Sequence, residues 1–411
     1  MVQKLERFLE THEKGAYDRD NFDRYASKRK LILSCPVIHV TGSNGKGSTV
    51  HFLEGIYMAA GYRVATFTKP QFYEVNETIR YQGKPIDDET LAKLYQECKK
   101  DFEKFGLTAF EATVALAYRY FESVHPDIAL IEAGMGGAID ATNLEDLQTR
   151  LAIITSVSLE HTNYLGTTAS QIALHKAGII KPECHVLVGK LDESCLDTIR
   201  EVCSDLDAQL HRIEDYHGDR LKDGIFHFDY AGYKDLGIAT YASYQIKNAC
   251  LAISAVGLLQ EEFPVTEAQL RDGLLVTSLP GRAENLGRIV LDGAHNPEAV
   301  ENLTKCLYSA SKGRKIHVLF ASFRDKNIAV ELPTLANHTS DITLTTFAHP
   351  RARTEEDYFL YVEDHPFVED AVGALTALLE QYPDDVVLVT GSLNFVGYMR
   401  KEILTRGLDQ K

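Results

Sequence analysis

Short hydrophobic runs alternate with amphipathic stretches along most of the chain. Apolar residues recur at helical spacing over residues 91–105 and 112–121, which predicts two helices that each turn one face to a core. Strands that alternate with helices are typical of an α/β fold with a mostly parallel sheet. Five runs rich in aliphatic and β-branched residues predict such strands in the first half of the chain: residues 37–40, 63–68, 127–132, 151–157 and 185–188.

A second series of strands and helices follows the segment at 279–282, so we expect a domain boundary near residue 280. The predicted domains are residues 1–280 and residues 281–411. Within the first of these, residues 211–241 are richer in Gly, Asp and Tyr, which favours a small antiparallel insertion. The second series comprises predicted strands at 288–291, 315–320, 341–346 and 386–390, and predicted helices at 297–307 and 368–382.

Composition places the chain among ordinary globular proteins. It has 411 residues, of which 45% are hydrophobic and 25% charged, enough for two units that each bury a core. The formal net charge is -16, which argues against a nucleic-acid partner because a phosphate backbone would meet a repulsive field. An anionic substrate therefore needs a locally positive pocket.

Cysteine spacing and hydropathy bear on the compartment. The seven cysteines form no C-x-x-C pair, so we expect free thiols rather than a zinc site or a redox motif. The first residues lack the apolar core of a signal peptide, and no apolar run is long enough to span a bilayer. These observations predict a cytoplasmic protein without a membrane partner.

The first predicted strand leads into a glycine-rich loop and then a helical pattern. Residues 41–49 read T-G-S-N-G-K-G-S-T. Glycines let successive backbone N–H groups face an anion, and the positive end of the following helix points at it. Lys46 would add charge at the β- and γ-phosphates, and Ser48 or Thr49 would ligate Mg²⁺. We therefore expect ATP and Mg²⁺ to bind this loop through Gly42, Asn44, Gly45, Lys46, Gly47, Ser48 and Thr49.

The loop departs from the strict G-x-x-x-x-G-K-[ST] pattern. Val40 stands at the first glycine position, and Gly47 separates Lys46 from Ser48. A tight turn of small residues is the structural alternative, but the strand before and the helix after favour phosphate binding. This variant resembles the loop of Mur ligases and folylpolyglutamate synthases, and further blocks of that family follow in the expected order across most of the chain.

Three blocks of the first half resemble family segments that surround the metal ions. The block E-A-G-M-G-G-A-I-D-A-T-N resembles one whose first Glu holds Mg²⁺, which implies that role for Glu132. The block at 155–166 resembles one whose His binds a second Mg²⁺, which implies that role for His161. The segment H-K-A-G-I-I-K resembles one whose first lysine is carbamylated, which implies a carbamylated Lys176.

Later blocks resemble segments that bind nucleotide and amino acid. Q-I-K-N-A resembles a helix start whose Asn contacts the nucleotide, here Asn248, and P-G-R-A-E resembles an interdomain hinge whose Arg reaches the phosphates, here Arg282. L-D-G-A-H-N-P implies nucleotide and glutamate binding by Asp292 and His295. The closing T-G-S-L implies that Ser392 lies near the incoming amino acid.

The resemblance implies an α/β fold with an N-terminal P-loop-type ATPase domain, built on a mostly parallel sheet, and a smaller Rossmann-like C-terminal domain. It implies an ATP-dependent ligase that adds L-glutamate to the carboxylate of (tetrahydro)folate or folylpolyglutamate through an acyl phosphate, with dihydropteroate as a further acceptor. Lys46, Lys176 and His295 would serve catalysis. The expected partners are these small molecules, and we expect a monomer.

Several positions depart from the family pattern. Lys69 replaces a Ser that approaches Mg²⁺, and Gln71 lies in the same altered segment. Ala138 replaces an Arg, Glu160 replaces an Asp before His161, and Asn327 replaces an Asp. Two alternatives therefore stay open: a Mur-type ligase with another carboxylate acceptor, and a nucleotide-binding regulatory protein that has lost ligation. A plain P-loop kinase would leave the later blocks unexplained.

Overall fold

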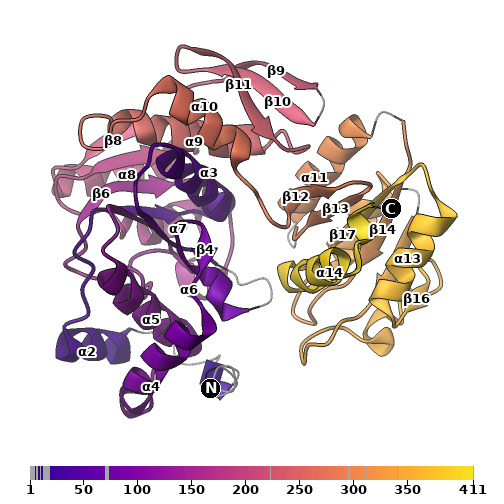
Figure 1. Cartoon of the computed structure of the whole chain (residues 1–411), viewed down its shortest axis with the longest axis horizontal. Helices are drawn as coiled ribbons and strands as arrows, with labels where there is room; N and C mark the ends of the chain where they lie inside the picture. The colour runs from indigo at the N-terminus through magenta and orange to yellow at the C-terminus, as the bar shows by residue number, and fades with distance from the viewer. Residues whose placement is uncertain are drawn as a thin grey trace. The chain divides into compact units, whose positions relative to one another are not determined.

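The computed structural model describes residues 19–69, 74–222, 224–294, 297–311, 313–339 and 341–410, together with residues 5, 8, 9, 11 and 12. The chain divides into two compact units (Figure 1). The first unit comprises Met1–His217, Asp229–Leu236 and Lys247–Thr277, and the second comprises Gly218–Phe228, Gly237–Ile246 and Ser278–Lys411.

The first unit is built on an eight-stranded sheet of order β4-β3-β2-β5-β1-β6-β7-β8. Strands β2, β5, β1, β6, β7 and β8 pair in parallel, and β3 and β4 add an antiparallel edge. The central strands are buried on both faces, which explains their continuous apolar runs. The strands are β1 (Val37–Thr41), β2 (Val64–Phe67), β3 (Ile79–Tyr81), β4 (Lys84–Pro85), β5 (Ile128–Glu132), β6 (Thr149–Ile154), β7 (His185–Val188) and β8 (Gln209–Arg212).

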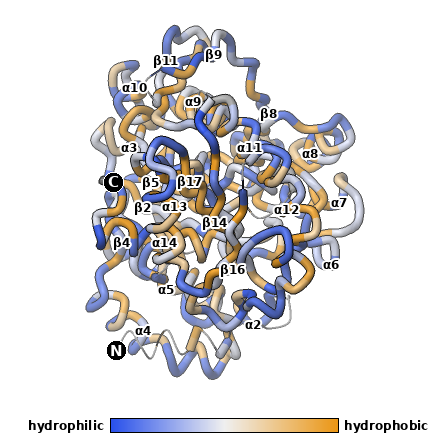
Figure 2. Tube along the Cα trace, turned by 90° about the vertical axis from the view of Figure 1, so that its right-hand side faces the viewer, coloured by the Kyte–Doolittle hydropathy of each residue, from blue (hydrophilic) through white to orange (hydrophobic). Residues whose placement is uncertain are grey.

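Helices cover this sheet, and their ends follow from local sequence. In α5, the Thr108 side chain accepts from the Glu111 backbone while Glu111 reaches back to Thr108, a capping box. Hydrophilic and hydrophobic positions alternate along α4, whose apolar face packs into the core (Figure 2). The helices are α2 (Asp20–Arg29), α3 (Lys46–Ala59), α4 (Asp88–Phe105), α5 (Ala109–Val124), α6 (Thr162–Leu165), α7 (Ala169–Ala177), α8 (Glu193–Asp205), α9 (Gln245–Leu258) and α10 (Glu267–Val276).

A separate three-stranded sheet of order β11-β10-β9 occupies the stretch for which an insertion was predicted. Its strands are β9 (His217–Lys222), β10 (Ile225–Tyr230) and β11 (Tyr233–Ala239). Only Ala231 and Gly232 join β10 to β11, a link short enough for an antiparallel hairpin. Both residues have positive φ, as such tight links require.

The second unit contains a six-stranded sheet of order β12-β13-β17-β14-β15-β16, in which β12 runs antiparallel to β13 and the other pairs are parallel. Val318 and Leu388 pack with α11 and α12, whereas Leu319 and Val389 pack with α13 and α14, so helices cover both faces. The elements are β12 (Arg282–Leu286), β13 (Ile289–Asp292), α11 (Pro297–Ala310), β14 (Ile316–Phe320), α12 (Ile328–Ala336), β15 (Asp341–Thr345), β16 (Phe367–Val368), α13 (Ala371–Gln381), β17 (Val386–Thr390) and α14 (Leu393–Arg406).

The α/β fold class and the parallel core of both sheets are confirmed, and two predicted boundaries need correction. The strand expected at 151–157 ends at Ile154, because Thr155 and Ser156 turn to bond the glycine-rich loop. The helix expected at 368–382 begins at Ala371, because the Asp370 carboxylate accepts from two backbone N–H groups and caps it. No helix in the described part of the chain has both the length and the apolar character needed to cross a bilayer.

Candidate active site

The glycine-rich loop links the carboxyl end of β1 to the first turn of α3. Gly42 has φ +150° and Gly45 has φ +89°, conformations that favour glycine. A Cβ atom at Gly45 would lie 2.3 Å from Asn248 Oδ1. The loop therefore needs glycine both for its backbone shape and because the Asn248 side chain of α9 packs directly against it.

Hydrogen bonds to the segment after β6 hold the loop in shape. The Thr155 hydroxyl donates to the Asn44 carbonyl at 2.5 Å, and the Asn44 N–H donates to Ser156 Oγ at 2.9 Å. The Ser43 N–H donates to the Ser156 carbonyl at 3.0 Å. This bonding fixes the loop without a ligand, so that little ordering remains when a phosphate binds.

Lys46, the first residue of α3, folds back over the loop. Its Nζ donates to the Gly42 carbonyl at 2.6 Å and to the Ser43 carbonyl at 3.3 Å. These partners are neutral, whereas a phosphate oxygen would offer a charge-assisted bond. The ammonium is therefore placed to exchange a backbone carbonyl for a phosphate.

Lys176 lies beneath this loop as a buried cation. Its side chain is only 1% exposed, and Nζ donates to Glu160 Oε1 at 2.8 Å. Burial lowers the pKa of the Lys176 ammonium to about 8, and the nearby Lys46 adds to the shift, while Glu160 opposes it. Burial would raise the pKa of Glu160, but the ammonium groups of Lys176 and Lys46 outweigh it and hold that pKa below its ordinary value.

Glu132 ends β5 beside the start of α3. It is 2% exposed, and a Cβ atom at Gly47 would lie 3.2 Å from its Oε2. The backbone N–H of Lys69 donates to the same oxygen at 3.1 Å. Burial lowers the pKa of the half-buried Lys69 ammonium to about 8, against the opposing effect of Glu132 and Asp140, so the charged form predominates at pH 7.

The turn after Glu132 is tied together by Asp140, which is buried. Its carboxylate accepts from the Met135 N–H at 2.8 Å and from the Thr142 N–H at 3.0 Å. Arg19 reaches the same turn and donates to the carbonyls of Ala138, at 3.1 Å, and Asp140, at 3.2 Å. The motif at 131–143 therefore keeps its shape although Ala138 stands where the family pattern has an arginine.

The start of α3 offers oxygen atoms suited to one Mg²⁺ ion. Ser48 is buried and directly follows Gly47, the residue that packs against the Glu132 carboxylate, and the buried Thr49 hydroxyl has no hydrogen-bond partner. Mg²⁺ at nucleotide sites is usually held by one or two protein oxygens and the phosphates, so this set fits one ion. Within the described ranges, no three His, Cys, Asp or Glu side chains gather as an all-protein metal cage.

His161, the predicted ligand of a second Mg²⁺, lies at the start of α6. Its side chain is exposed and its φ is +46°, an uncommon conformation for a residue with a Cβ atom. The neighbouring Glu160, not His161, bonds Lys176. The structure thus brings together Lys46, Glu160 and Lys176, and the metal role of His161 stays a prediction.

In the second unit, Asp292 is buried, and its carboxylate connects β12, β13 and the segment before α9 through hydrogen bonds. Its Oδ2 accepts from the Tyr244 hydroxyl at 2.9 Å and from the Ala283 N–H at 2.6 Å, and its Oδ1 accepts from the Ala294 N–H at 2.8 Å. Burial raises the pKa of Asp292, and the facing Arg282 partly offsets this. Asp292 and Arg282, both predicted to take part in nucleotide binding, therefore lie next to each other. Asp292 also has a structural role there.

Ser392 and His295 are the other two predicted site residues of the second unit, and the structure describes Ser392 alone. Ser392 is buried, and its Oγ accepts from the Phe395 N–H at 3.1 Å as the N-cap of α14. His295 lies outside the described residues, as does Gln71 in the first unit. Their predicted parts in substrate binding therefore stay predictions.

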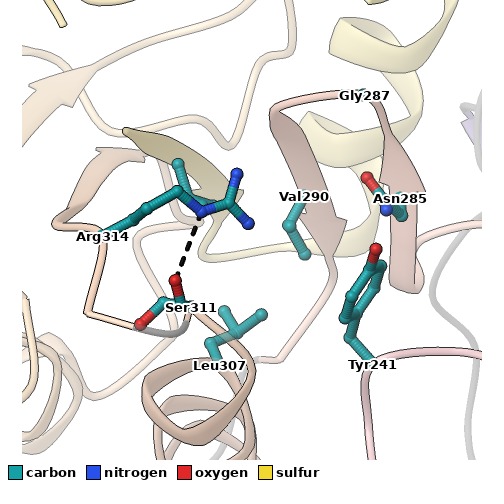
Figure 3. A pocket seen from close by; sticks show the side chains of 8 residues that line it. Tyr241, Asn285, Gly287, Val290, Leu307, Ser311 and Arg314 are labelled. Atoms are coloured by element: carbon teal, nitrogen blue, oxygen red, sulfur yellow. Dashed lines mark hydrogen bonds between the residues drawn. The ribbon is translucent and has the colours of Figure 1, made fainter. Parts of the chain in front are cut away.

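None of these residues lines the small pocket found in the second unit (Figure 3). Arg314 and Val386 on its wall stand at the amino-terminal ends of β14 and β17, whereas ligands of parallel sheets bind at the carboxyl ends. Arg314 donates to the Ser311 carbonyl. We assign no chemistry to this pocket.

Sequence reasoning missed several supporting residues. Thr155 and Ser156 shape the loop, and Phe110 lies under the Lys69 ammonium, 5.5 Å from it. Arg400 of α14 donates to both oxygens of Glu284 at 2.9 Å and so anchors the P-G-R-A-E segment. Glu284 in that motif indicated that a basic partner exists, but no local pattern in the sequence identifies Arg400 or Phe110.

Comparison with known proteins agrees with this geometry. Residues 40–256 match the Mur ligase middle domain, and residues 281–393 match the Mur ligase glutamate ligase domain. The chain is 32% identical to dihydrofolate synthase/folylpolyglutamate synthase of Bacillus subtilis, over 89% of this chain and 90% of the relative. It is 30% identical to the protein of that name from Escherichia coli, over 93% and 90%.

Solved structures show the same likeness. Folylpolyglutamate synthase of Thermotoga maritima superposes with a TM-score of 0.86 at 28% identity, covering 99% of this chain and 97% of that one. An Escherichia coli FolC structure in complex with ADP has a TM-score of 0.86 at 27% identity, covering 98% of each chain. The chain belongs to the Mur ligase family, within its dihydrofolate synthase/folylpolyglutamate synthase group of ATP-dependent acid–amino-acid ligases.

Proposed function

We propose that this protein uses ATP to activate the terminal carboxylate of a folate and joins it to the amine of L-glutamate. The observation that carries the proposal is the preformed phosphate loop, with Lys46 over its carbonyls and Glu132 beside α3, in a chain of this ligase family. Amide formation from a carboxylate in water is uphill, and phosphoryl transfer supplies the activation.

The reaction proceeds in two displacements. A folate carboxylate oxygen attacks the γ-phosphorus in line, ADP leaves, and an acyl phosphate forms. The neutral glutamate amine then attacks the acyl carbon, and inorganic phosphate leaves with the former carboxylate oxygen. Lys46 exchanges the Gly42 carbonyl for a γ-phosphate oxygen and neutralises the charge that develops there. The rigid loop and its backbone N–H groups keep the phosphates in line.

Ser48 and Glu132 would hold Mg²⁺ at the start of α3. A bound ion would supply positive charge that offsets the negative charge of the phosphates during transfer. Glu132 is already oriented for this by the Lys69 backbone N–H. This gives Glu132 a fixed geometry before metal arrives.

Lys176 is proposed to be carbamylated. Its amine is buried, and its lowered pKa gives a larger neutral fraction at physiological pH than an exposed lysine has. The neutral amine nitrogen attacks CO₂ and releases a proton to solvent, and the resulting carbamate is an anion in place of a cation. The competing state of the Lys176 side chain is the unmodified ammonium, which pairs with Glu160.

The remaining predicted residues keep their proposed roles. Asn248, which packs on Gly45, is proposed to contact the nucleotide, and Arg282 its phosphates. Asp292, His295 and Ser392 are proposed to serve nucleotide and glutamate binding. We further propose that the enzyme is a monomer and, from its seven free cysteines, that it works in the reducing cytoplasm.

Dihydropteroate is the second acceptor to consider, because relatives such as the Bacillus subtilis protein carry both synthase names. A wholly different carboxylate acceptor is the further alternative, since Lys69, Ala138 and Glu160 depart from the family pattern. A regulatory protein without ligation is disfavoured, because Lys46, Glu132 and Lys176 are all retained in a connected site.

Isotope transfer tests the chemistry. Folate labelled with ¹⁸O in its terminal carboxylate is incubated with ATP, Mg²⁺ and glutamate, and phosphate and product are analysed by mass spectrometry. Acyl phosphate chemistry transfers one ¹⁸O to inorganic phosphate when the first glutamyl unit is added, and the assay is stopped while the singly glutamylated product predominates. A glutamylated product accompanied by unlabelled phosphate contradicts the acyl phosphate.

A further inference from the structure

Lys69 sits at the end of β2, directly beside Glu132 at the end of β5. The two strands pair in parallel, with Phe67 opposite Ile131, so the residues that follow them emerge at the same edge of the sheet. The bond that holds Glu132 Oε2 comes from the Lys69 backbone N–H, at 3.1 Å. A substitution at position 69 can therefore change the side chain while keeping the bond that orients Glu132.

The Lys69 side chain carries its ammonium into the same region. Nζ lies 5.5 Å from the centre of the Phe110 ring, at a distance suited to a cation–π contact. Phe110 in turn packs on the turn after Glu132, because a Cβ atom at Gly134 would lie 2.5 Å from the ring. The ammonium is thus held near the carboxyl groups of Glu132 and Asp140, both of which act on it electrostatically.

The Lys69 ammonium changes the balance of positive and negative charges around the phosphate loop and Glu132. In the unmodified protein, ammonium groups come from Lys46, Lys69 and Lys176, and carboxyl groups come from Glu132, Asp140 and Glu160. Three cations thus face three carboxyl groups, and carbamylation of Lys176 would leave Lys46 and Lys69 as the two cations. With an uncharged residue at position 69, the carboxyl groups would outnumber the cations, and a divalent ion would be drawn to Glu132 more strongly.

We propose that Lys69 is a resident cation of the nucleotide site: its ammonium supplies positive charge beside Glu132 that a divalent ion otherwise supplies. Two consequences of opposite sign follow. The ammonium repels a divalent ion from Glu132 and so weakens metal binding, and it attracts nucleotide phosphates and so strengthens binding of nucleotide without metal. The inference deepens the proposed function by assigning a charge role to one residue of that site.

The test compares Lys69→Met, which removes the charge without adding an oxygen ligand, with Lys69→Arg, which keeps the charge. Mn²⁺ binding to the nucleotide-free protein is measured by electron paramagnetic resonance at pH 7. Binding of a non-hydrolysable ATP analogue in the presence of a chelator is measured by calorimetry. Lys93→Met on the exposed face of α4 controls for loss of a positive charge from the surface, and thermal unfolding checks that each variant is folded.

We expect Lys69→Met to bind Mn²⁺ at least about ten-fold more tightly than the wild type, and metal-free analogue at least about ten-fold more weakly. Lys69→Arg and Lys93→Met should match the wild type in both measurements. Equal Mn²⁺ affinity in the wild type and Lys69→Met would overturn the proposal, as would a Lys69→Arg variant that behaves like Lys69→Met. Both measurements are made without folate or glutamate, so a failure of the ligase assignment would leave their result intact.

Discussion

Lys46 holds its ammonium on two backbone carbonyls, those of Gly42 and Ser43, and a phosphate entering the loop replaces these neutral partners with a charged one. We predict that Lys46→Met lowers the rate of phosphate release from ATP by about 100-fold or more, because the charge that stabilises the transferring phosphoryl group is lost. The rate is measured under saturating folate, glutamate and Mg²⁺.

A surface lysine serves as the matched control. Lys190 pairs with Asp215 and is well exposed, so Lys190→Met should leave the rate within about two-fold of the wild type. A Lys46→Met protein that unfolds at the wild-type temperature and keeps full activity would remove Lys46 from the mechanism.

Lys176 makes a second prediction at the same scale. Its pKa of about 8 lies below that of an exposed lysine, so the neutral fraction is about one-tenth at pH 7 and about one-half at pH 8. A carbamate signal in ¹³C NMR with labelled bicarbonate should therefore grow as the pH rises from 7 to 8.5. Lys176→Arg, which keeps the charge but forms no such carbamate, should lack the signal. A wild-type spectrum without it at every pH contradicts the modification.

Sequence alone identified the residues of the phosphate loop, because glycines, a lysine and hydroxyl residues follow a strand in the order that a phosphate site requires. It could not show that Thr155 and Ser156 bond this loop or that Arg19 bonds the turn after Glu132, since these partners are distant from each other along the chain. Glu160 shows the same limit, because its pair with Lys176 depends on how α7 packs below the loop.

Among the helices, α3 and α10 approach each other through glycines. A Cβ atom at Gly273 would lie 2.4 Å from Ile56 Cα, and one at Gly55 would lie 2.7 Å from the Gly273 carbonyl oxygen. We predict that Gly273→Ala lowers the free energy of unfolding by about 1–3 kcal/mol, because the helices must move apart to accept the methyl group. Urea unfolding monitored by circular dichroism measures this change.

Gly257 in α9 is the matched control. A Cβ atom there meets nothing within 4 Å, so Gly257→Ala should stabilise the protein, by up to about 1 kcal/mol, through the higher helix propensity of alanine. If Gly273→Ala and Gly257→Ala change the free energy of unfolding alike, the close approach of α3 and α10 is not the reason for glycine at position 273.

At the scale of elements, the strands β1, β5, β14 and β17 were predictable because each is buried on both faces and consists mostly of aliphatic and β-branched residues. The short strands β4 and β16, of two residues each, were not, because so few residues show no period. The end of β6 was misplaced for a related reason: Val157 continues the apolar run, and only the tertiary bonds of Thr155 and Ser156 reveal the turn.

For the whole molecule, the net charge of -16 contrasts with the chemistry of ATP and folate, which are anions. Lys46 and Lys69 supply the local positive charge that composition required of any anion site, and Lys176 adds to it only while it is unmodified. The order of motifs indicated the family, whereas the acceptor depends on side chains that differ from the family pattern.

The measurement that tests the central claim most directly is glutamyl transfer by the whole protein. Purified protein is incubated with ATP, Mg²⁺, L-glutamate and either tetrahydrofolate, its glutamyl-elongated forms or dihydropteroate, while phosphate release and product mass are followed together. The account predicts a folate product heavier by one glutamyl unit, with one phosphate released for each unit added. Protein that binds ATP yet forms no glutamylated product from any folate or pteroate would contradict it.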